Sequence, residues 1–192
     1  MPNILTINKP NITDFAKERN VLLNNSKNEW NLFLDNDEIQ AKGYEKLNNQ
    51  LNIKNYEHES YYLTRKNYFL GQYVGTDKII RLVKKGTGKW VRAVHEVWIP
   101  NDNSKVGIID DTHIIHNTAD NLADYINKMN NYSSLHSKEN LKEGKKSSLF
   151  KIIFFPIQKF IATYIKSKNI VFSIMQSLHS FLSWSKLYFL QH

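Results

Sequence analysis

The sequence predicts an α/β protein that ends in amphipathic helices, and three observations lead to this class. The chain has 192 residues, of which 41% are hydrophobic and 12% aromatic, a composition that supports a packed core and excludes collagen-like and wholly disordered chains. Short apolar runs rich in β-branched and aromatic residues recur between residues 30 and 116, with helical periodicity before and after them. From residue 149 onward, apolar side chains recur at three- and four-residue steps.

The first helix is predicted to begin after Asp14 and to end near Asn25. Thr13 and Asp14 offer an N-cap, and Glu18 falls in the first turn. The run 30–34 is short and almost wholly apolar, which favours a buried strand over a helix. Residues 1–9 can supply at most one short strand before this helix.

Six further segments are expected to be strands because of their β-branched and aromatic content, the first two of them as a pair. They are residues 60–65, 69–74, 78–84, 91–99, 105–109 and 112–116. A helix is predicted over 119–134, and the polar, glycine-containing segment 137–148 is predicted to be a linker. The predicted division is therefore a domain of residues 1–136, the linker, and a helical region of residues 149–192.

Positive charge is concentrated near the C-terminal end. The chain has 26 Lys and Arg against 18 Asp and Glu, a net charge of +8, and residues 131–192 hold nine lysines but only two glutamates. Apolar residues of 169–185 share one helix face, a pattern that fits a helix packed on the protein's own core and a helix at a membrane surface equally well. The neighbouring lysines favour an anionic membrane. Nucleic acid is not expected as a partner, because no nucleic-acid-binding motif accompanies the charge.

Three carboxylates, Asp35, Asp37 and Glu38, directly follow the strand predicted at 30–34. In open α/β sheets the carboxyl ends of strands converge where ligands bind, and carboxylate oxygens suit a hard divalent cation. The chain has no cysteine, so any metal must be held by carboxylates and imidazoles. An ordinary acidic turn would give the same local pattern. Taken alone, Glu96 is better explained as a solvated strand residue and His116 as a structural histidine.

Several spaced motifs together resemble the family 2 glycosyltransferases. The segments Asp14–Asn20 (DFAKERN) and Glu29–Glu38 (EWNLFLDNDE) are similar to a family segment that places an acidic D-x-D pair after a strand. Further motifs follow in the order seen in the lipopolysaccharide-core subgroup of that family. They are residues 62–71, 81–83, 94–96, 116, 128–133, 156–165 and 178–186. The resemblance covers nearly the whole chain from Asp14.

The resemblance implies a GT-A fold, which is a Rossmann-like mixed sheet, together with a nucleotide-sugar donor and Mg²⁺ or Mn²⁺. It implies that Asp37 and His116 hold the metal, that Asp35 contacts the donor ribose or the metal shell, and that Arg81 and Lys84 add donor phosphate contacts. Glu96 lies where this fold places its catalytic base. Independently of the family, a carboxylate ionised at neutral pH can accept the proton of an acceptor hydroxyl.

The expected function is therefore metal-dependent transfer of a sugar to a lipid-linked or cell-envelope glycan. The expected location is the cytoplasm, peripherally at the inner face of the cytoplasmic membrane, through the C-terminal basic amphipathic helices. Family members carry a nucleotide-binding unit ahead of the DFA segment, whereas thirteen residues precede Asp14 here, so an N-terminally truncated domain is expected. The alternative expectation is a catalytically inactive remnant that binds a membrane or a partner.

Overall fold

The computed structural model describes residues 2–7, 12–40, 58–101 and 106–192. Within them the chain forms two units. The sheet unit comprises Met1–Asn67 and Thr76–Asn117, and the helical unit comprises Tyr68–Gly75 and Thr118–His192. Each unit has a core of its own and is described separately.

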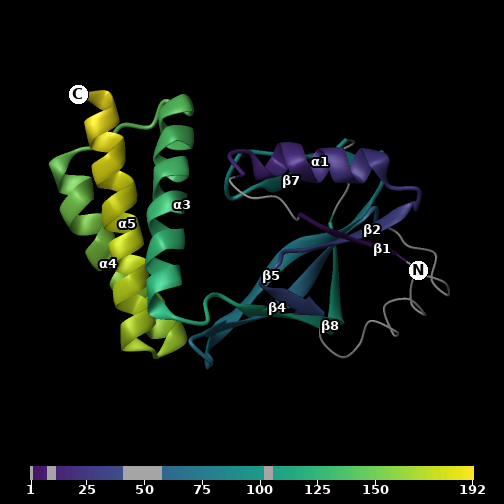
Figure 1. Ribbon diagram of the computed structural model, residues 1–192, viewed down its shortest axis with the longest axis horizontal. Helices are drawn as coiled ribbons and strands as arrows, with labels where there is room; N and C mark the ends of the chain where they lie inside the picture. Colours follow the sequence, from purple (N-terminus) through teal and green to yellow (C-terminus); the bar gives the residue numbers. More distant parts are fainter. Residues whose placement is uncertain (1, 8–11, 41–57, 102–105) are drawn as a thin grey trace. The chain divides into compact units, whose positions relative to one another are not determined.

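A six-stranded mixed sheet forms the centre of the first unit (Figure 1). β1 pairs with β2 in parallel, whereas β2 with β5 and β3 with β8 are antiparallel. In spatial order the strands are β1 (Asn3–Thr6), β2 (Trp30–Leu34), β5 (Gln72–Lys84), β4 (Ser60–Phe69), β8 (Gly107–Asn117) and β3 (Glu38–Gln40). The prediction of an α/β protein with a mixed sheet is confirmed, and the arrangement is compatible with a Rossmann-like fold.

Both faces of this sheet are buried. Side chains of a strand alternate between faces, so Leu32 and Leu34 enter one cluster with Leu63 and Leu82, while Phe33 enters the other. The second cluster is completed by helix α1 (Phe15–Asn25) and by a separate two-stranded ribbon of β6 (Gly88–Val91) and β7 (Val97–Pro100). A run that is buried on both sides explains why residues 30–34 are almost continuously apolar.

Helix α1 begins as predicted. The side chain of its N-cap, Asp14, accepts a hydrogen bond from the backbone N–H of Lys17 at 2.9 Å. The helix is tied to the β6–β7 ribbon by the Asn20 side chain, which bonds both the backbone carbonyl and the N–H of Trp90 at 2.8 and 2.9 Å. The backbone N–H of Phe15 also donates to Ala93 O at 2.9 Å. The loop 92–96 between β6 and β7 is thereby held against the start of α1.

Three strand predictions differ from the structure. Residues 69–74 are not a strand of their own, because the hairpin turn lies at Leu70 and Gly71, both with positive φ, and separates β4 from β5. Residues 91–99 are divided between β6 and β7 by a turn in which Arg92 and His95 also have positive φ. Conversely, residues 105–109 and 112–116 were predicted as two strands, but residues 107–117 form one.

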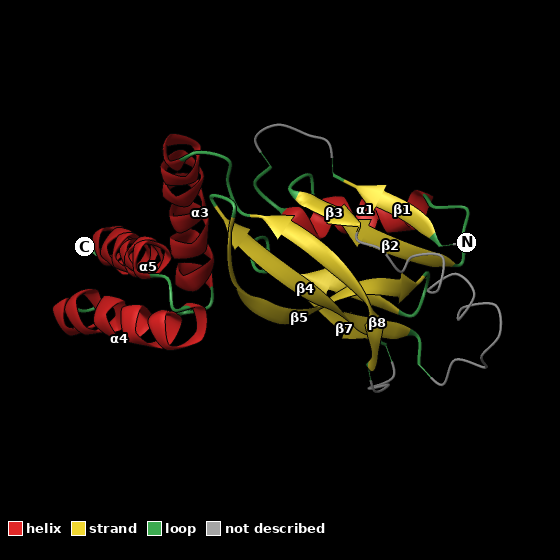
Figure 2. Ribbon diagram, turned by 90° about the horizontal axis from the view of Figure 1, so that it is seen from below, coloured by secondary structure: helices red, strands yellow, loops and turns green. Residues whose placement is uncertain are grey.

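The helical unit contains α3 (Leu122–Lys142), α4 (Leu149–Ser167) and α5 (Ile170–Gln191), which are labelled in Figure 2. Both C-terminal helices were predicted. The prediction of a linker at 137–148 is wrong for residues 137–142, which continue α3 and bury Ser137 and Asn140 within the unit. The unit boundary at Thr118 also precedes the predicted one. Within the described ranges, no helix is long and apolar enough to cross a membrane.

Candidate functional site

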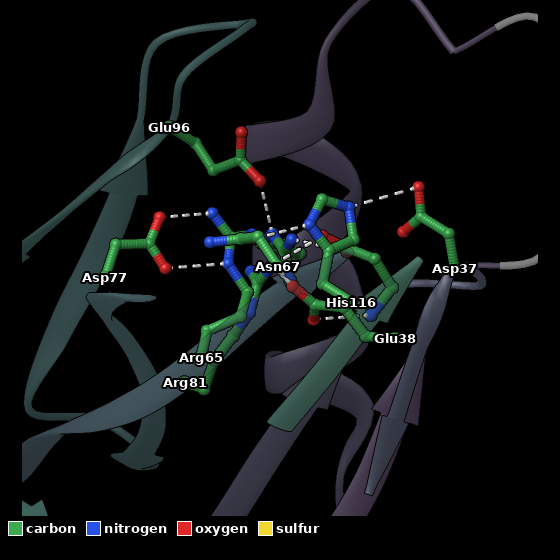
Figure 3. A network of polar contacts seen from close by, with 10 residues as sticks. Asp37, Glu38, Arg65, Asn67, Asp77, Arg81, Glu96 and His116 are labelled. Atoms are coloured by element: carbon green, nitrogen blue, oxygen red, sulfur yellow. Dashed lines mark hydrogen bonds and ion pairs between the residues drawn. The ribbon is translucent and has the colours of Figure 1, made fainter. Parts of the chain in front are cut away.

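The acidic motif lies at the carboxyl end of β2, where the chain turns into β3 (Figure 3). The turn is closed by two hydrogen bonds: the N–H of Glu38 donates to Asp35 O at 2.9 Å, and the N–H of Asp35 donates to the Glu38 carboxylate at 3.1 Å. Glu38 is fully buried, whereas the side chains of Asp35 and Asp37 retain about a third of their exposure, at 32% and 29%. The motif thus presents two carboxylates outward and directs the third into the protein.

Two buried arginines hold Asp35 from opposite sides. Arg81, on β5, donates to both Asp35 and Glu38, the latter at 2.7 Å. Arg19, on α1, donates from Nη2 to Asp35 Oδ1 at 2.6 Å and from Nε to Glu96 Oε1 at 2.7 Å. Through Arg19, the candidate base and the acidic motif belong to one ionic network, although 61 residues separate Asp35 from Glu96 in the sequence.

Arg19 is only 1% exposed, and its burial is compensated by aromatic contacts as well as by ion pairs. Its guanidinium carbon lies 5.3 Å from the ring centre of Phe33 and 5.2 Å from that of Trp90. Arginine tolerates such a site because its planar cation stacks on aromatic faces while its N–H groups remain directed at carboxylates. The side chain therefore fixes the ribbon that precedes Glu96 to the strand that precedes Asp35.

A third arginine extends the network along β4. Arg65 binds Asp77 with two parallel hydrogen bonds of 3.0 and 2.8 Å, and its Nη1 donates to Glu38 at 3.0 Å. Such a two-bond pairing between a guanidinium and a carboxylate is stronger and more directional than a single contact. Glu38 is consequently bound by two arginines, Arg65 and Arg81.

The network shifts the ionisation of its members. Burial alone would raise the pKa of Asp35, but the charges of Arg81 and Arg19 outweigh burial and hold that pKa below its ordinary value of 3.8. For Asp77 the effect of burial is likewise outweighed, here by the hydrogen bonds and charge of Arg65, so its pKa is also lowered. Burial would lower the pKa of Arg81, yet Asp35 and Glu38 raise it. These groups remain charged throughout the neutral range.

The shifts predict that the protein loses stability in acid. A carboxylate with a lowered folded-state pKa contributes stability that is fully present above its unfolded-state pKa and is lost as the pH falls through its folded-state pKa. Urea midpoints measured over a pH series should therefore fall below about pH 4. Asp77→Asn should flatten that dependence, because it removes one of the two shifted groups. If the urea midpoint of this variant depended on pH as strongly as that of the native chain, Asp77 would not be one of the groups responsible.

Asp37 faces His116 across the β3–β8 pairing, in which Glu38 lies opposite His116. Its Oδ2 is 3.5 Å from Nε2 of the imidazole, and the backbone N–H of Asn117 donates to Asp37 O at 3.0 Å. On the other side of the ring, Nδ1 lies 2.8 Å from Asn67 Oδ1. The Asn67 amide also bonds Asp77, lowering its pKa, so the amide N–H₂ faces Asp77 and the amide oxygen faces the ring. The amide oxygen is an acceptor, so Nδ1 carries a proton and donates to it, and Nε2 is the ring nitrogen that faces the Asp37 carboxylate.

The structure brings together five of the six side chains predicted from the sequence: Asp35, Asp37, Arg81, Glu96 and His116. Lys84 is not among them. It lies opposite Trp30 at the far end of β2 and pairs with Glu29 at 3.0 Å on the surface. Arg81 is in the cluster but only 7% exposed and directed at two carboxylates, an arrangement suited to positioning them.

Four members of the network were not predicted as site residues: Arg19, Arg65, Asn67 and Asp77. Arg19 belongs to the DFAKERN segment, and Arg65 and Asn67 belong to the motif at 62–71, so their place in spaced motifs was an available signal. Asp77 lies on β5, where a charged residue in a strand is usually a solvent-facing one. Among the described residues, no group of three or more His, Asp or Glu side chains is arranged to hold a metal ion. Asp37 and His116 form a pair.

The sequence is 25% identical over 118 residues to the lipopolysaccharide core biosynthesis glycosyltransferase LpsC of Rhizobium meliloti (strain 1021). The matched region covers 57% of this chain and 43% of that protein. The chain thus spans less than half the length of this relative. No protein-family model matches the present chain. The similarity is weak, and it supports a relationship to glycosyltransferases in general.

Proposed function

We propose that this chain carries a GT-A-type catalytic domain of the family 2 glycosyltransferases. In this proposal it transfers a sugar from a nucleotide-sugar donor to a lipid-linked or cell-envelope glycan at the inner face of the cytoplasmic membrane. The observation that carries the proposal is the ionic network joining the D-x-D motif after β2 to Glu96 through Arg19. A weak similarity to a glycosyltransferase agrees with it.

The donor set at Asp37 and His116 fits a divalent cation. A metal-binding histidine typically donates its other ring N–H to an oxygen acceptor, as Nδ1 does to Asn67. Both side chains are partly exposed, and a carboxylate oxygen and an imidazole nitrogen face one another at 3.5 Å. Mg²⁺ usually takes only one or two protein ligands and completes its shell with substrate phosphates and water. Two protein ligands are therefore sufficient for a cation that arrives with a diphosphate.

The charge of the network supports the same conclusion. Its carboxylates outnumber its arginines by two: Asp35, Asp37, Glu38, Asp77 and Glu96 against Arg19, Arg65 and Arg81. A site with this excess of negative charge repels a free diphosphate. One divalent cation offsets the excess, so we infer that donor binding requires the metal. When bound, such a cation stabilises charge that develops on the leaving diphosphate.

We assign the residues the following roles. Glu96 accepts the proton of the acceptor hydroxyl while the hydroxyl oxygen bonds to the anomeric carbon and the bond to the diphosphate breaks. Asp35 contacts the donor with lone pairs that its arginines leave available, since each carboxylate oxygen can accept two hydrogen bonds. Arg19 and Arg81 position these two carboxylates rather than binding phosphate.

Isothermal titration with UDP and other nucleoside diphosphates, with and without Mn²⁺, tests the proposal. We expect binding that requires the metal in the native chain and its loss in Asp37→Ala. Asp110→Ala serves as the matched control, because Asp110 is an exposed carboxylate of the sheet unit that pairs with Lys78 on the surface. Absence of metal-dependent binding for every nucleotide would sink the proposal.

The alternative is an inactive protein that retains the fold. It is favoured by the engagement of Asp35 with two arginines and of Glu96 with one, since a network of satisfied ion pairs can be purely structural. The same titration separates the two functions. Metal-dependent nucleotide binding requires a working donor site, which the inactive protein lacks.

A further inference from the structure

Helix α4 exposes a continuous apolar face to solvent. With about 100° between successive residues, seven large side chains fall within one arc of the helix, and all are 43–61% exposed. They are Phe150, Ile153, Phe154, Ile157, Ile161, Tyr164 and Ile165. Pro156, about 120° from the middle of this arc, is buried and packs within the helical unit. An amphipathic helix normally turns its apolar stripe toward the core, whereas α4 presents its widest apolar arc outward.

Helix α5 has an exposed apolar arc of the same kind. Its members are Ile170, Val171, Ile174, Leu178, Phe181 and Phe189, with exposures from 37% to 78%. Its buried positions include Ser173, Ser183 and Leu187. Small serines therefore occupy the packed side of this helix, while large apolar residues lie outside.

The two arcs lie on the same side of the α4–α5 hairpin. The helices are antiparallel, since Ser177 Oγ donates to Pro156 O at 2.9 Å and Ser147 Oγ donates to Trp184 O at 2.7 Å, which brings the start of α4 to the end of α5. Viewed from its own N-terminus, each helix reaches its exposed arc by turning in the same direction from the line along which it contacts the other helix. An antiparallel pair is related by an approximate two-fold axis perpendicular to the plane that contains both helices. Rotation about this axis places one helix on the other, so the two arcs lie on the same side of that plane. Figure 2 shows the two helices side by side.

The charge around this face has one sign. Residues 144–192 contain seven lysines and no Asp or Glu. Lys186 is directed at Asn130, Ser133 and Ser134 of α3, and the other six lie on or just before the hairpin. Lys159, Lys166 and Lys168 are exposed. By the same 100° step, Lys159 and Lys166 lie on the side of α4 away from its apolar arc. A helix with a wide apolar face and lysines on its other face is the pattern of helices that lie in the plane of an anionic bilayer surface.

We propose that the α4–α5 hairpin docks in the interfacial layer of an anionic lipid bilayer, with its combined apolar face toward the acyl chains. Lipid is favoured over a second copy of this chain, because a symmetric dimer would bring together two hairpins that carry lysines and no carboxylate side chain, whereas anionic headgroups attract each lysine near the surface. The proposal does not depend on the glycosyltransferase assignment.

Flotation of the 192-residue chain with lipid vesicles tests this docking. We expect it to float with vesicles containing phosphatidylglycerol, and to float less with phosphatidylcholine alone or at high salt, since salt screens the lysines. The variant I153S/F154S/I157S alters three exposed side chains and should lower the partition coefficient more than about tenfold. The matched control L122S/I126S alters exposed apolar residues of α3 outside the face, and should float like the native chain.

Two results would overturn the proposal. One is equal flotation of the triple variant and the native chain with circular dichroism unchanged. The other is absence of flotation combined with a concentration-dependent dimer, seen by sedimentation velocity, that the triple variant abolishes; the face would then be an interface between copies.

Discussion

Replacing Arg81 with Met is expected to lower the free energy of unfolding by about 3–5 kcal/mol, because it leaves buried charge without its partner. Arg81 donates to Asp35 and to the fully buried Glu38. Methionine occupies part of the same volume but offers no N–H group. Arg65 remains near Glu38 at 3.0 Å, so part of the compensation survives, yet Asp35 and Glu38 would then repel one another within one turn.

Urea denaturation at neutral pH measures this change. Lys84→Met is the matched control, because Lys84 also lies on β5 and also pairs with a glutamate, but on the surface. An exposed pair of this kind is worth about 0–1 kcal/mol. Equal losses in the two variants would show that the arginine network contributes no more than an ordinary surface ion pair.

Replacing Glu96 with Gln should reduce sugar transfer by about 10²- to 10⁴-fold, the usual contribution of a general base. The substitution is close to isosteric, and the Gln amide oxygen can still accept the hydrogen bond that Arg19 Nε makes to Glu96 at 2.7 Å. It cannot take up the acceptor proton. We therefore expect turnover to fall while nucleotide binding and unfolding free energy change little, a separation that a purely structural glutamate would not produce.

Hydrolysis and transfer of nucleotide-sugars, followed by chromatography of the released diphosphate, give the turnover. Glu29→Gln is the control, since Glu29 is an exposed carboxylate of the same unit, far along β2 from the acidic motif. Transfer at the native rate in the Glu96 variant would remove this residue from the mechanism. Loss of folding in circular dichroism would instead indicate that its pairing with Arg19 is structural.

The elements that the sequence predicted correctly are those determined by residues close together in the chain. An aspartate N-cap and helical period identified α1, a short apolar run identified β2, a mostly apolar run indicated α4, and an amphipathic period identified α5. The errors fall where local cues mislead. Apolar residues recur through 91–99 although the backbone reverses between them, with Arg92 and His95 at positive φ and no glycine to mark the turn.

The end of α3 was missed for a related reason. Residues 137–142 are polar and charged, which is typical of a linker, but their helix is stabilised by tertiary packing that buries Ser137 and Asn140. Polarity alone does not separate a surface helix turn from a loop. Periodicity is the better guide, but only when the buried positions are apolar.

For the candidate site, sequence reasoning identified Arg81 and the acidic residues within motifs but missed the other two arginines that link them, Arg19 and Arg65. Asp35 and Asp37 could be predicted because they follow a strand, and Glu96 could be predicted because of the family resemblance. Arg65 and Asp77 depend on the pairing of β4 with β5, and Asn67 on its proximity to His116. Such contacts join side chains from separate strands, so no short window of sequence contains them. Lys84 was wrongly predicted to be a site residue. It lies three residues beyond Arg81 on β5, opposite Trp30, and so at the end of β2 that is far from the acidic motif.

The attachment of the loop 92–96 to α1 has a consequence for the order in which the molecule assembles. The bonds that fix this loop join Asn20 to Trp90 and Arg19 to Glu96, across 70 and 77 residues of sequence. Closing a long loop costs more entropy than closing a short one, and contacts between distant residues form more slowly. The α4–α5 hairpin, by contrast, is closed by a connection of only two residues. Forming the contacts around Glu96 therefore costs more loop-closure entropy than forming the α4–α5 hairpin.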